Sequence, residues 1–270
     1  MQNIPETLGI IAGSGAYPAA MAAGARRAGV ARVAVAAFVG ETDPALEAGV
    51  EAWEWLKVGH LGKLSKFLRR EGVSQAVMCG QIAPKNLFAL SPDLRLLMML
   101  ARLKERNAET LFGGIADELA KDGITLLSAV SFLQDHLPAA GHLCGPTRRA
   151  KDLADVDFGL KIARECSRLD IGQTVVVRRG TVLAVEAFEG TNECIQRGGQ
   201  LGKGRATVVK VSKPQQDFRF DVPVVGPQTI AAAGAAGVAV VAIEAGRTLW
   251  LEPEATARLC EQWGVTLVAV

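Results

Sequence analysis

A short apolar run at residues 8–12 leads directly into the turn Gly13-Ser14-Gly15, and an alanine-rich helical stretch follows up to about Gly29. Strand, glycine turn and helix in this order open a Rossmann-like unit, whose turn faces the ligand. Glycines let the backbone approach a phosphate, and the free N–H groups of the helix start bind anions. Because Pro18 stands where a dinucleotide fingerprint has its third glycine, the turn favours a phosphate or sugar over NAD. A plain tight turn is the alternative.

The first half continues as an α/β alternation, which predicts a parallel sheet. Residues 76–79 form a short apolar strand, and Gly80 and Gln81 follow it directly. Open α/β sheets bind ligands beyond the carboxyl ends of their strands. We therefore expect Gly80 and Gln81, together with Gly13 and Ser14, to bind the substrate.

Residues 91–106 have the periodicity of an amphipathic helix. We expect Leu94, Leu97, Met98 and Leu100 on its inner side. A stripe of leucine and methionine is more often core than ligand cleft, although it would also suit an acyl chain.

A change in composition divides the chain into two domains. The histidines, prolines and glycines of residues 134–149 are typical of a linker. We predict a Rossmann-like N-terminal domain with a parallel sheet at residues 1–133, a linker at 134–149 and a C-terminal catalytic domain of mixed α/β structure at 150–270.

Residues 210–230 (KVSKPQQDFRFDVPVVGPQTI) carry an unusual density of charged and polar side chains. Asp217 and Asp221 are four residues apart, so they share a face in an extended chain or in a helical turn. Lys210 and Lys213 flank them. Paired carboxylates beside lysines suit a divalent cation bound next to phosphate oxygens. A solvated loop with local ion pairs is the alternative.

Residues 189–192 (EGTN) precede a short predicted helix. Thr191 and Asn192 are favourable N-cap residues, and a helix start with free N–H groups also binds anions. Gln173 lies in the turn before the preceding predicted hairpin. We count these three residues as further candidates for substrate binding, with plain capping as the alternative for Thr191 and Asn192.

Composition excludes several classes of protein. The chain has 270 residues, of which 49% are hydrophobic and 21% charged, as expected of a globular domain pair. A net charge of +2 does not predict nucleic-acid binding. The five cysteines lack any CxxC spacing and indicate reduced thiols in a cytoplasmic protein. The apolar tract at 230–243 is too short to span a membrane, so any membrane contact is expected to be peripheral.

Three stretches carry a family resemblance that runs nearly end to end: LGIIAGSGAYP, RLDIGQTVVVRRGTVLAVEAFEGT and KVSKPQQDFRFDVPVVGPQTI. With them the chain resembles the LpxI family of UDP-2,3-diacylglucosamine pyrophosphatases of lipid A biosynthesis. The resemblance implies two α/β-type domains and hydrolysis that depends on Mg²⁺ or Mn²⁺. The products would be UMP and 2,3-diacylglucosamine 1-phosphate, with water attacking the sugar-side phosphorus.

The resemblance also implies roles for single residues. The family's catalytic aspartate falls on Asp221 and the acidic residue before it on Asp217, and we expect both to bind the metal. Lys210 and Lys213 would bind phosphate oxygens. Many members read EGTD where this chain reads EGTN, so Asn192 stands in place of a carboxylate.

The resemblance leaves two other classes of function open. The glycine turn also fits a Rossmann-type oxidoreductase or nucleotide-sugar enzyme, and Asn192 also fits a relative that binds lipid or nucleotide without catalysis. Besides the lipid-nucleotide substrate, we expect transient contact with the inner membrane surface and no nucleic-acid partner. The sequence leaves open whether the protein forms a homodimer.

Overall fold

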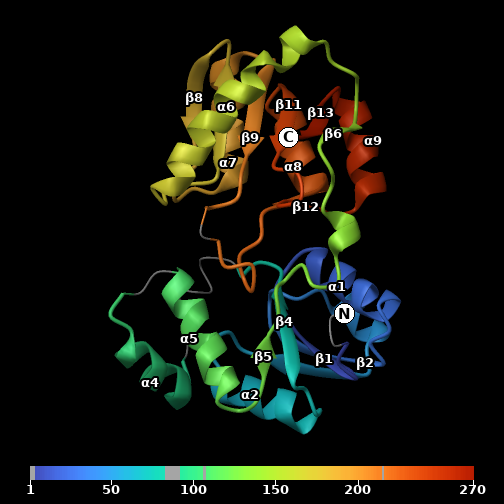
Figure 1. The fold of residues 1–270 in the computed structure, drawn as a ribbon, viewed down its shortest axis with the longest axis vertical. Coiled ribbons are helices and arrows are strands. Elements are labelled where there is room, and N and C mark those ends of the chain that lie inside the picture. Colours follow the sequence, from blue (N-terminus) through green and yellow to red (C-terminus); the bar gives the residue numbers. More distant parts are fainter. Residues whose placement is uncertain (1–3, 83–91, 106–107, 215) are drawn as a thin grey trace. The chain divides into compact units, whose positions relative to one another are not determined.

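The computed structural model describes residues 4–82, 92–105, 108–214 and 216–270, and it shows two compact units (Figure 1). The first unit comprises the chain up to Leu133 together with Asp217–Asp221. The second comprises Gln134–Gln216 and Val222–Val270. The short segment that holds both candidate aspartates therefore packs with the first unit, although it comes from the second half of the sequence.

The first unit is built on a five-stranded parallel sheet. Its strands, in spatial order, are β3 (Ala52–Leu56), β2 (Arg32–Phe38), β1 (Thr7–Ala12), β4 (Gln75–Cys79) and β5 (Thr125–Leu126). The order reverses between β1 and β4, and such a switch point is where doubly wound sheets bind ligands. The predicted parallel sheet is confirmed.

Helices pack on this sheet around apolar clusters. α1 (Tyr17–Arg27) packs against β1 and β4, whereas α2 (Leu61–Arg70), α4 (Leu94–Arg102) and α5 (Ala108–Ala120) share a core cluster with the strands. Right-handed crossovers and the reversal of strand order place α1 and α2 on opposite faces of the sheet. The short 3₁₀ helix η1 (Pro44–Gly49) connects β2 and β3.

The predicted inner face of the helix at 91–106 was wrong for three of its four residues. In α4 the side chains of Leu94, Leu97 and Met98 are exposed, and only Leu100 packs against the core. Leu96 and Met99 are buried instead. Periodicity located an apolar face, but α4 carries apolar side chains around most of its circumference, so its rotation is decided by polar contacts described below.

The second unit contains a six-stranded mixed sheet. Its strands, in spatial order, are β6 (Gly141–Cys144), β13 (Thr266–Ala269), β11 (Val238–Ile243), β9 (Ala206–Lys210), β7 (Thr174–Arg178) and β8 (Thr181–Val185). β9, β11 and β13 are parallel, and β6, β7 and β8 are antiparallel to their neighbours. The predicted mixed α/β structure is confirmed.

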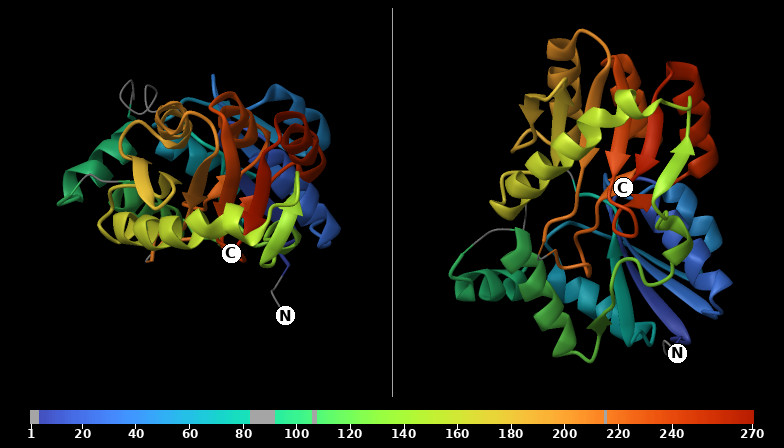
Figure 2. Two further views of the ribbon diagram at one scale, coloured as in Figure 1. Left: turned by 90° about the horizontal axis from the view of Figure 1, so that it is seen from above. Right: turned by 45° about the horizontal axis from the view of Figure 1, so that its top comes forward.

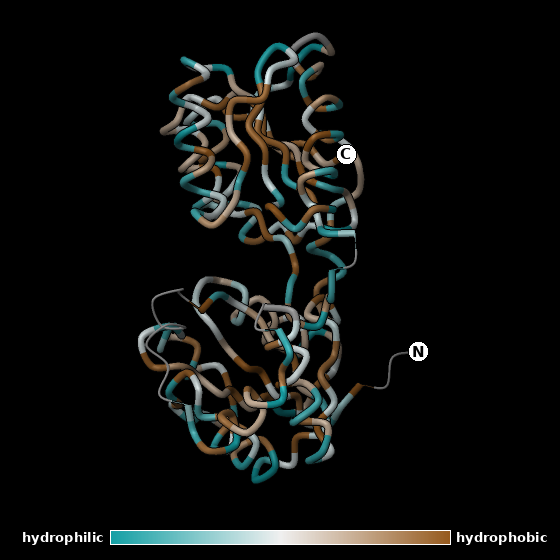
Figure 3. The backbone as a smooth tube through the Cα atoms, turned by 90° about the vertical axis from the view of Figure 1, so that its left-hand side faces the viewer, coloured by the Kyte–Doolittle hydropathy of each residue, from teal (hydrophilic) through white to brown (hydrophobic). Residues whose placement is uncertain are grey.

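Helices cover both faces of the second sheet (Figure 2). α6 (Ala150–Arg168) packs on one apolar cluster, and α7 (Thr191–Gly202), α8 (Pro227–Ala235) and α9 (Pro253–Trp263) enclose another. The central strands are accordingly the most apolar part of this unit (Figure 3).

Two smaller features complete the second unit. β10 (Val224–Val225) and β12 (Leu249–Trp250) form a short parallel pair. Residues 134–149, predicted as a linker, contain the 3₁₀ helix η2 (Gln134–His136) and the strand β6, which pairs with β13. No helix among the described residues is long and apolar enough to cross a membrane.

Candidate active site

The two glycine turns predicted to bind substrate lie against each other at the switch point of the first sheet. Gly13 N donates to Cys79 O at 2.8 Å, and Ser14 N donates to Gln81 O at 2.8 Å. The return bond from Gln81 N to Ser14 O is 3.3 Å long. A Cβ on Gly13 would lie 2.5 Å from Gln81 O. The close approach of the two turns therefore requires glycine, and the structure brings all four predicted residues together.

A mostly apolar cavity of about 130 Å³ opens beside these turns, within the first unit. Gly13 and Gly80 form part of its wall at the carboxyl ends of β1 and β4. Leu96 of α4 and Phe112 of α5 line it from the helices, and Phe220 contributes a further ring. Cys79 also lines this cavity, and burial raises the pKa of its thiol, which disfavours the thiolate form.

The contacts that anchor residues 217–221 to the first unit include backbone hydrogen bonds and the ring of Phe220. Ala129 N donates to Phe218 O at 2.6 Å, and the buried Tyr17 hydroxyl donates to Ala129 O at 2.6 Å. The Phe220 ring lies 5.4 Å from that of Phe112, centroid to centroid. Asp217 and Asp221 therefore pack with the first unit.

The two aspartates share one turn but have different surroundings. Asp221 N donates to Asp217 O at 3.0 Å, which closes the turn. The Asp217 carboxylate binds the Arg219 guanidinium through both oxygens, with a shortest distance of 2.6 Å. These hydrogen bonds, opposed by burial, hold the pKa of Asp217 below its usual range. Among the described residues no side chain pairs with the half-buried Asp221 carboxylate, which leaves its oxygens available to a ligand.

Candidate residues of the second unit gather where β9 ends. Lys210 is paired with Thr174 of β7, and Glu186 N donates to Thr174 O at 2.8 Å, so these three residues form one row across the sheet. Paired residues in antiparallel strands share a face. Lys210 Nζ donates to Val224 O at 3.1 Å. The row places the Lys210 ammonium and the Glu186 carboxylate at the edge of the second sheet where β9 ends.

α7 begins beside this row, although its cap differs from the prediction. Gly190 is the N-cap, with φ of 92°, and no side chain caps the helix. Thr191 is the first helical residue, and its hydroxyl donates to Glu186 Oε1 at 2.8 Å. Asn192 is exposed in the same turn. The capping alternative for Thr191 and Asn192 is therefore wrong, and the N–H groups of the first turn remain available to an anion.

Gln173 and Lys213 frame the same edge. The Gln173 backbone carbonyl accepts from Val211 N at 2.9 Å, while its Oε1 is buried without a hydrogen bond in the described part of the chain. Glu186 Oε2 and Thr174 Oγ1 are buried in the same way. Lys213 forms an ion pair with Asp170. Three buried polar atoms without partners make this edge chemically suited to a hydroxyl-bearing or cationic ligand.

Comparison with known proteins decides the family. The chain matches the family model of the LpxI N-terminal domain over residues 7–136 and that of the LpxI C-terminal domain over residues 139–268. The chain belongs to the LpxI family. It is also 35% identical over 274 residues to the protein of Caulobacter vibrioides named UDP-2,3-diacylglucosamine pyrophosphatase LpxI, and the match covers 97% of each chain.

A metal ion fits the donors that this LpxI-family chain offers at Asp221. Over residues 4–82, 92–105, 108–214 and 216–270, no three His, Cys, Asp or Glu side chains are grouped as a metal site. Mg²⁺ is usually held by one or two carboxylates together with substrate phosphates rather than by a protein cage. The Asp221 carboxylate would supply such a ligand, whereas the Asp217 carboxylate is bound to Arg219 in this structure.

Sequence reasoning missed two carboxylates near the candidate residues of the second unit of this LpxI-family chain. Glu186 was overlooked because it is the last residue of a predicted hairpin strand, where a charged side chain is not unusual. Its position five residues before Thr191 was the available signal. Glu244 follows β11 and is buried; it accepts from Ser212 N at 2.9 Å, from Ser212 Oγ at 2.8 Å and from Arg164 at 3.1 Å. Its place at the carboxyl end of a central parallel strand was the available signal.

Proposed function

We propose that this protein hydrolyses the pyrophosphate bond of UDP-2,3-diacylglucosamine in lipid A biosynthesis, with Mg²⁺ or Mn²⁺ as cofactor. The products would be UMP and 2,3-diacylglucosamine 1-phosphate. The observation that carries the proposal is the near full-length match to a protein with that named activity. The uncommitted carboxylate of Asp221 beside an apolar cavity supports it.

Hydrolysis of a pyrophosphate builds negative charge on its oxygens, so the protein must orient water and neutralise that charge. When bound, the divalent cation polarises the phosphate oxygens. Asp221 would bind the cation. It would also orient the water that attacks the sugar-side phosphorus. Asp217 would fix Arg219 and close the turn that presents Asp221.

The second unit would bind phosphate oxygens. Lys210 and Lys213 supply ammonium groups, and the first turn of α7 supplies N–H groups around Thr191 and Asn192. Asn192 contributes an amide, which can accept from or donate to a ligand but carries no charge. Gln173 supplies a buried carbonyl oxygen without a hydrogen bond among the described residues, which would accept from a hydroxyl of the substrate and not from a phosphate oxygen.

The first unit would bind the sugar or nucleotide and part of an acyl chain. Gly13, Ser14, Gly80 and Gln81 present backbone groups at the switch point. The cavity beside them is apolar enough for methylene groups, each of which contributes roughly 0.8 kcal/mol on burial. We further propose that the protein works in the cytoplasm, in transient contact with the inner membrane from which a two-chain substrate must come.

Metal dependence is tested by release of UMP from UDP-2,3-diacylglucosamine. We expect UMP to appear with added Mg²⁺ or Mn²⁺ and to fall to background with excess EDTA. Release that persists in the chelator would contradict the role given to the cation. Absence of release under all metal conditions, together with binding of NAD(P)H in a fluorescence titration, would favour an oxidoreductase instead.

A further inference from the structure

α4 presents an apolar stripe to solvent. Leu94 is 72% exposed, and Leu97 and Met98 are each 49% exposed. The three side chains lie at positions i, i+3 and i+4, which share one face of a helix. Large apolar side chains gathered on one helix face mark a surface that contacts a partner or a membrane.

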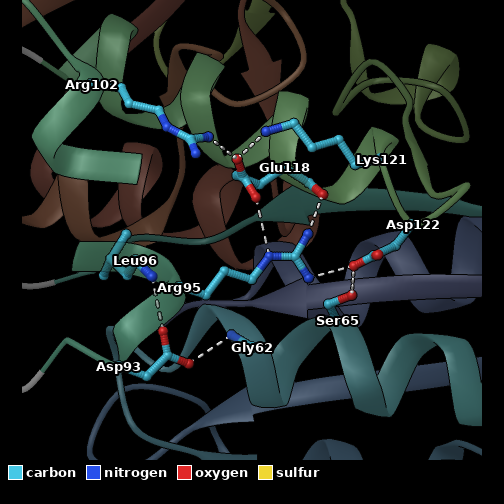
Figure 4. Close-up of polar contacts among 9 residues, drawn as sticks. All are labelled: Gly62, Ser65, Asp93, Arg95, Leu96, Arg102, Glu118, Lys121 and Asp122. Atoms are coloured by element: carbon cyan, nitrogen blue, oxygen red, sulfur yellow. Dashed lines mark hydrogen bonds and ion pairs between the residues drawn. The ribbon is translucent and has the colours of Figure 1, made fainter. Parts of the chain in front are cut away.

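The outward rotation of this stripe is fixed by a polar network on the inner side of α4 (Figure 4). Arg95 reaches between Glu118 and Asp122: its Nε lies 3.2 Å from Glu118 Oε2, its Nη1 pairs with Asp122, and its Nη2 donates to Glu118 O at 2.6 Å. The hydroxyl of Ser65 in α2 also donates to Asp122. Turning the leucines inward would expose this ion pair and leave Glu118 and Asp122 without their arginine.

The start of α4 is held as firmly. The Asp93 carboxylate accepts from Leu96 N at 2.9 Å and from Gly62 N of α2 at 2.6 Å. One side chain thus caps two helices, and a cap of this kind is worth about 1 kcal/mol. The exposed stripe therefore belongs to a well-anchored helix.

Basic side chains accompany the stripe. Arg102, at the end of α4, and Lys121 both pair with Glu118, and their side chains are 70% and 56% exposed. These pairs set three cations (Arg95, Arg102 and Lys121) against two carboxylates, and the Asp93 carboxylate at the start of α4 balances the third cation, so what remains for a headgroup is the exposure of Arg102 and Lys121. Exposed lysine and arginine beside an apolar helix face favour anionic lipid headgroups.

We propose that α4 docks this protein on the surface of an anionic phospholipid bilayer, with Leu94, Leu97 and Met98 inserted among the acyl chains and Arg102 and Lys121 at the headgroups. The inference rests on the proposed function, which requires a substrate with two acyl chains. Leu96, on the other side of the same helix, lines the apolar cavity. The helix that touches the bilayer thus also borders the place assigned to an acyl chain.

The test is flotation of the purified full-length protein with vesicles that contain no substrate. We expect binding to vesicles of phosphatidylcholine and phosphatidylglycerol at 3:1, and much weaker binding to phosphatidylcholine alone. The triple variant Leu94→Gln, Leu97→Gln, Met98→Gln should bind the anionic vesicles at least about tenfold more weakly, because three insertable side chains are lost. Arg102→Gln with Lys121→Gln should lower binding to anionic vesicles only.

A matched control replaces exposed apolar side chains away from α4. Val39 and Leu201 are 58% and 61% exposed, and Val39→Gln with Leu201→Gln should leave flotation unchanged. Exposed substitutions of this kind change stability by about 0.5 kcal/mol or less, which circular dichroism can verify. UMP release in detergent micelles should be the same for the triple variant and the wild type, because the stripe is outside the catalytic residues.

Three outcomes would overturn the inference. If the wild type does not bind anionic vesicles, the docking inference is overturned, and the hydrolase proposal stays intact. Equal flotation of the triple variant and the wild type would exclude α4 as the docking surface. A wild-type dimer that the triple substitution converts to a monomer in sedimentation equilibrium would assign the stripe to a second copy of the chain. Loss of UMP release with normal flotation would contradict only the proposed function.

Discussion

At the scale of single residues, Asp217 and Asp221 are identical side chains in one turn that have different surroundings. Asp217 is committed to Arg219, which lowers its pKa, whereas Asp221 has no such partner among the described residues. Neither the spacing nor the residue type could separate them in the sequence, because the distinction depends on where Arg219 folds. This difference supports our proposal that Asp221 binds the metal and the attacking water.

Replacement of Asp221 tests that assignment. Asp221→Ala and Asp221→Asn should each lower kcat by at least about a hundredfold, the loss expected when a key catalytic group is removed. Both variants should fold, because the Asp221 carboxylate pairs with no side chain in the described part of the chain. The measurement is UMP release at saturating substrate, with circular dichroism as the control. Near wild-type kcat would show that another carboxylate does this work.

Glu244 offers a test by pH. Burial raises its pKa, but the hydrogen bonds from Ser212 and the ion pair with Arg164 outweigh burial, so the pKa is lowered overall. A carboxyl with a lowered pKa in the folded state stabilises the protein fully above the ordinary glutamate pKa of about 4.3 and loses that contribution as pH falls through the lower value. Glu244→Gln should therefore lower the free energy of unfolding by about 1 to 3 kcal/mol at neutral pH.

The measurement is urea unfolding of the wild type and Glu244→Gln from pH 7 down to pH 3. The difference in unfolding free energy between the two proteins should be constant above about pH 5 and shrink below the ordinary glutamate pKa. A difference that stays the same at every pH would mean that the Glu244 charge is not what stabilises the fold.

At the scale of elements, the sequence revealed the order of strands and helices better than their contacts. The run of residues 8–12, the turn at Gly13 and the helix after it predicted the βα unit, because strand burial and glycine turns are local properties. The rotation of α4 was missed because it depends on the ion pairs of Arg95 with Glu118 and Asp122, which are more than twenty residues away in sequence. The packing of residues 217–221 on the first unit was missed for the same reason.

Phe220 is one of the side chains that anchor residues 217–221 to the first unit. Phe220→Ala should destabilise the protein by about 1 to 3 kcal/mol, less than for a fully buried ring because Phe220 is half-buried. It should also lower kcat by roughly tenfold or more, because loosening the turn displaces Asp221. Urea unfolding and UMP release measure the two effects.

Phe188 provides the matched control, since its ring is 89% exposed. Phe188→Ala should leave the free energy of unfolding unchanged. If Phe220→Ala were equally silent in stability and in kcat, the ring would not be what holds the aspartates in place.

At the scale of the whole molecule, the candidate residues are shared between the two units. Asp217 and Asp221 pack with the first unit, beside the glycine turns and the apolar cavity, and Lys210, Lys213 and Thr191 belong to the second. The sequence placed both aspartates in a C-terminal catalytic domain because they follow Lys210 in the chain. Chain order could not show that a five-residue segment packs with the first unit.

Hydrolysis in water enriched in ¹⁸O tests the central claim, attack of water on the sugar-side phosphorus of UDP-2,3-diacylglucosamine, most directly. The enzyme is incubated with substrate and Mg²⁺ in this water, and the masses of both products are measured by mass spectrometry. The Asp221→Ala variant is the control. We predict unlabelled UMP and a 2,3-diacylglucosamine 1-phosphate that carries one ¹⁸O atom, with both products at least about a hundredfold less abundant for the variant in the same time. Label in UMP would contradict the site of attack, and the absence of both products from the wild type would contradict the hydrolase itself.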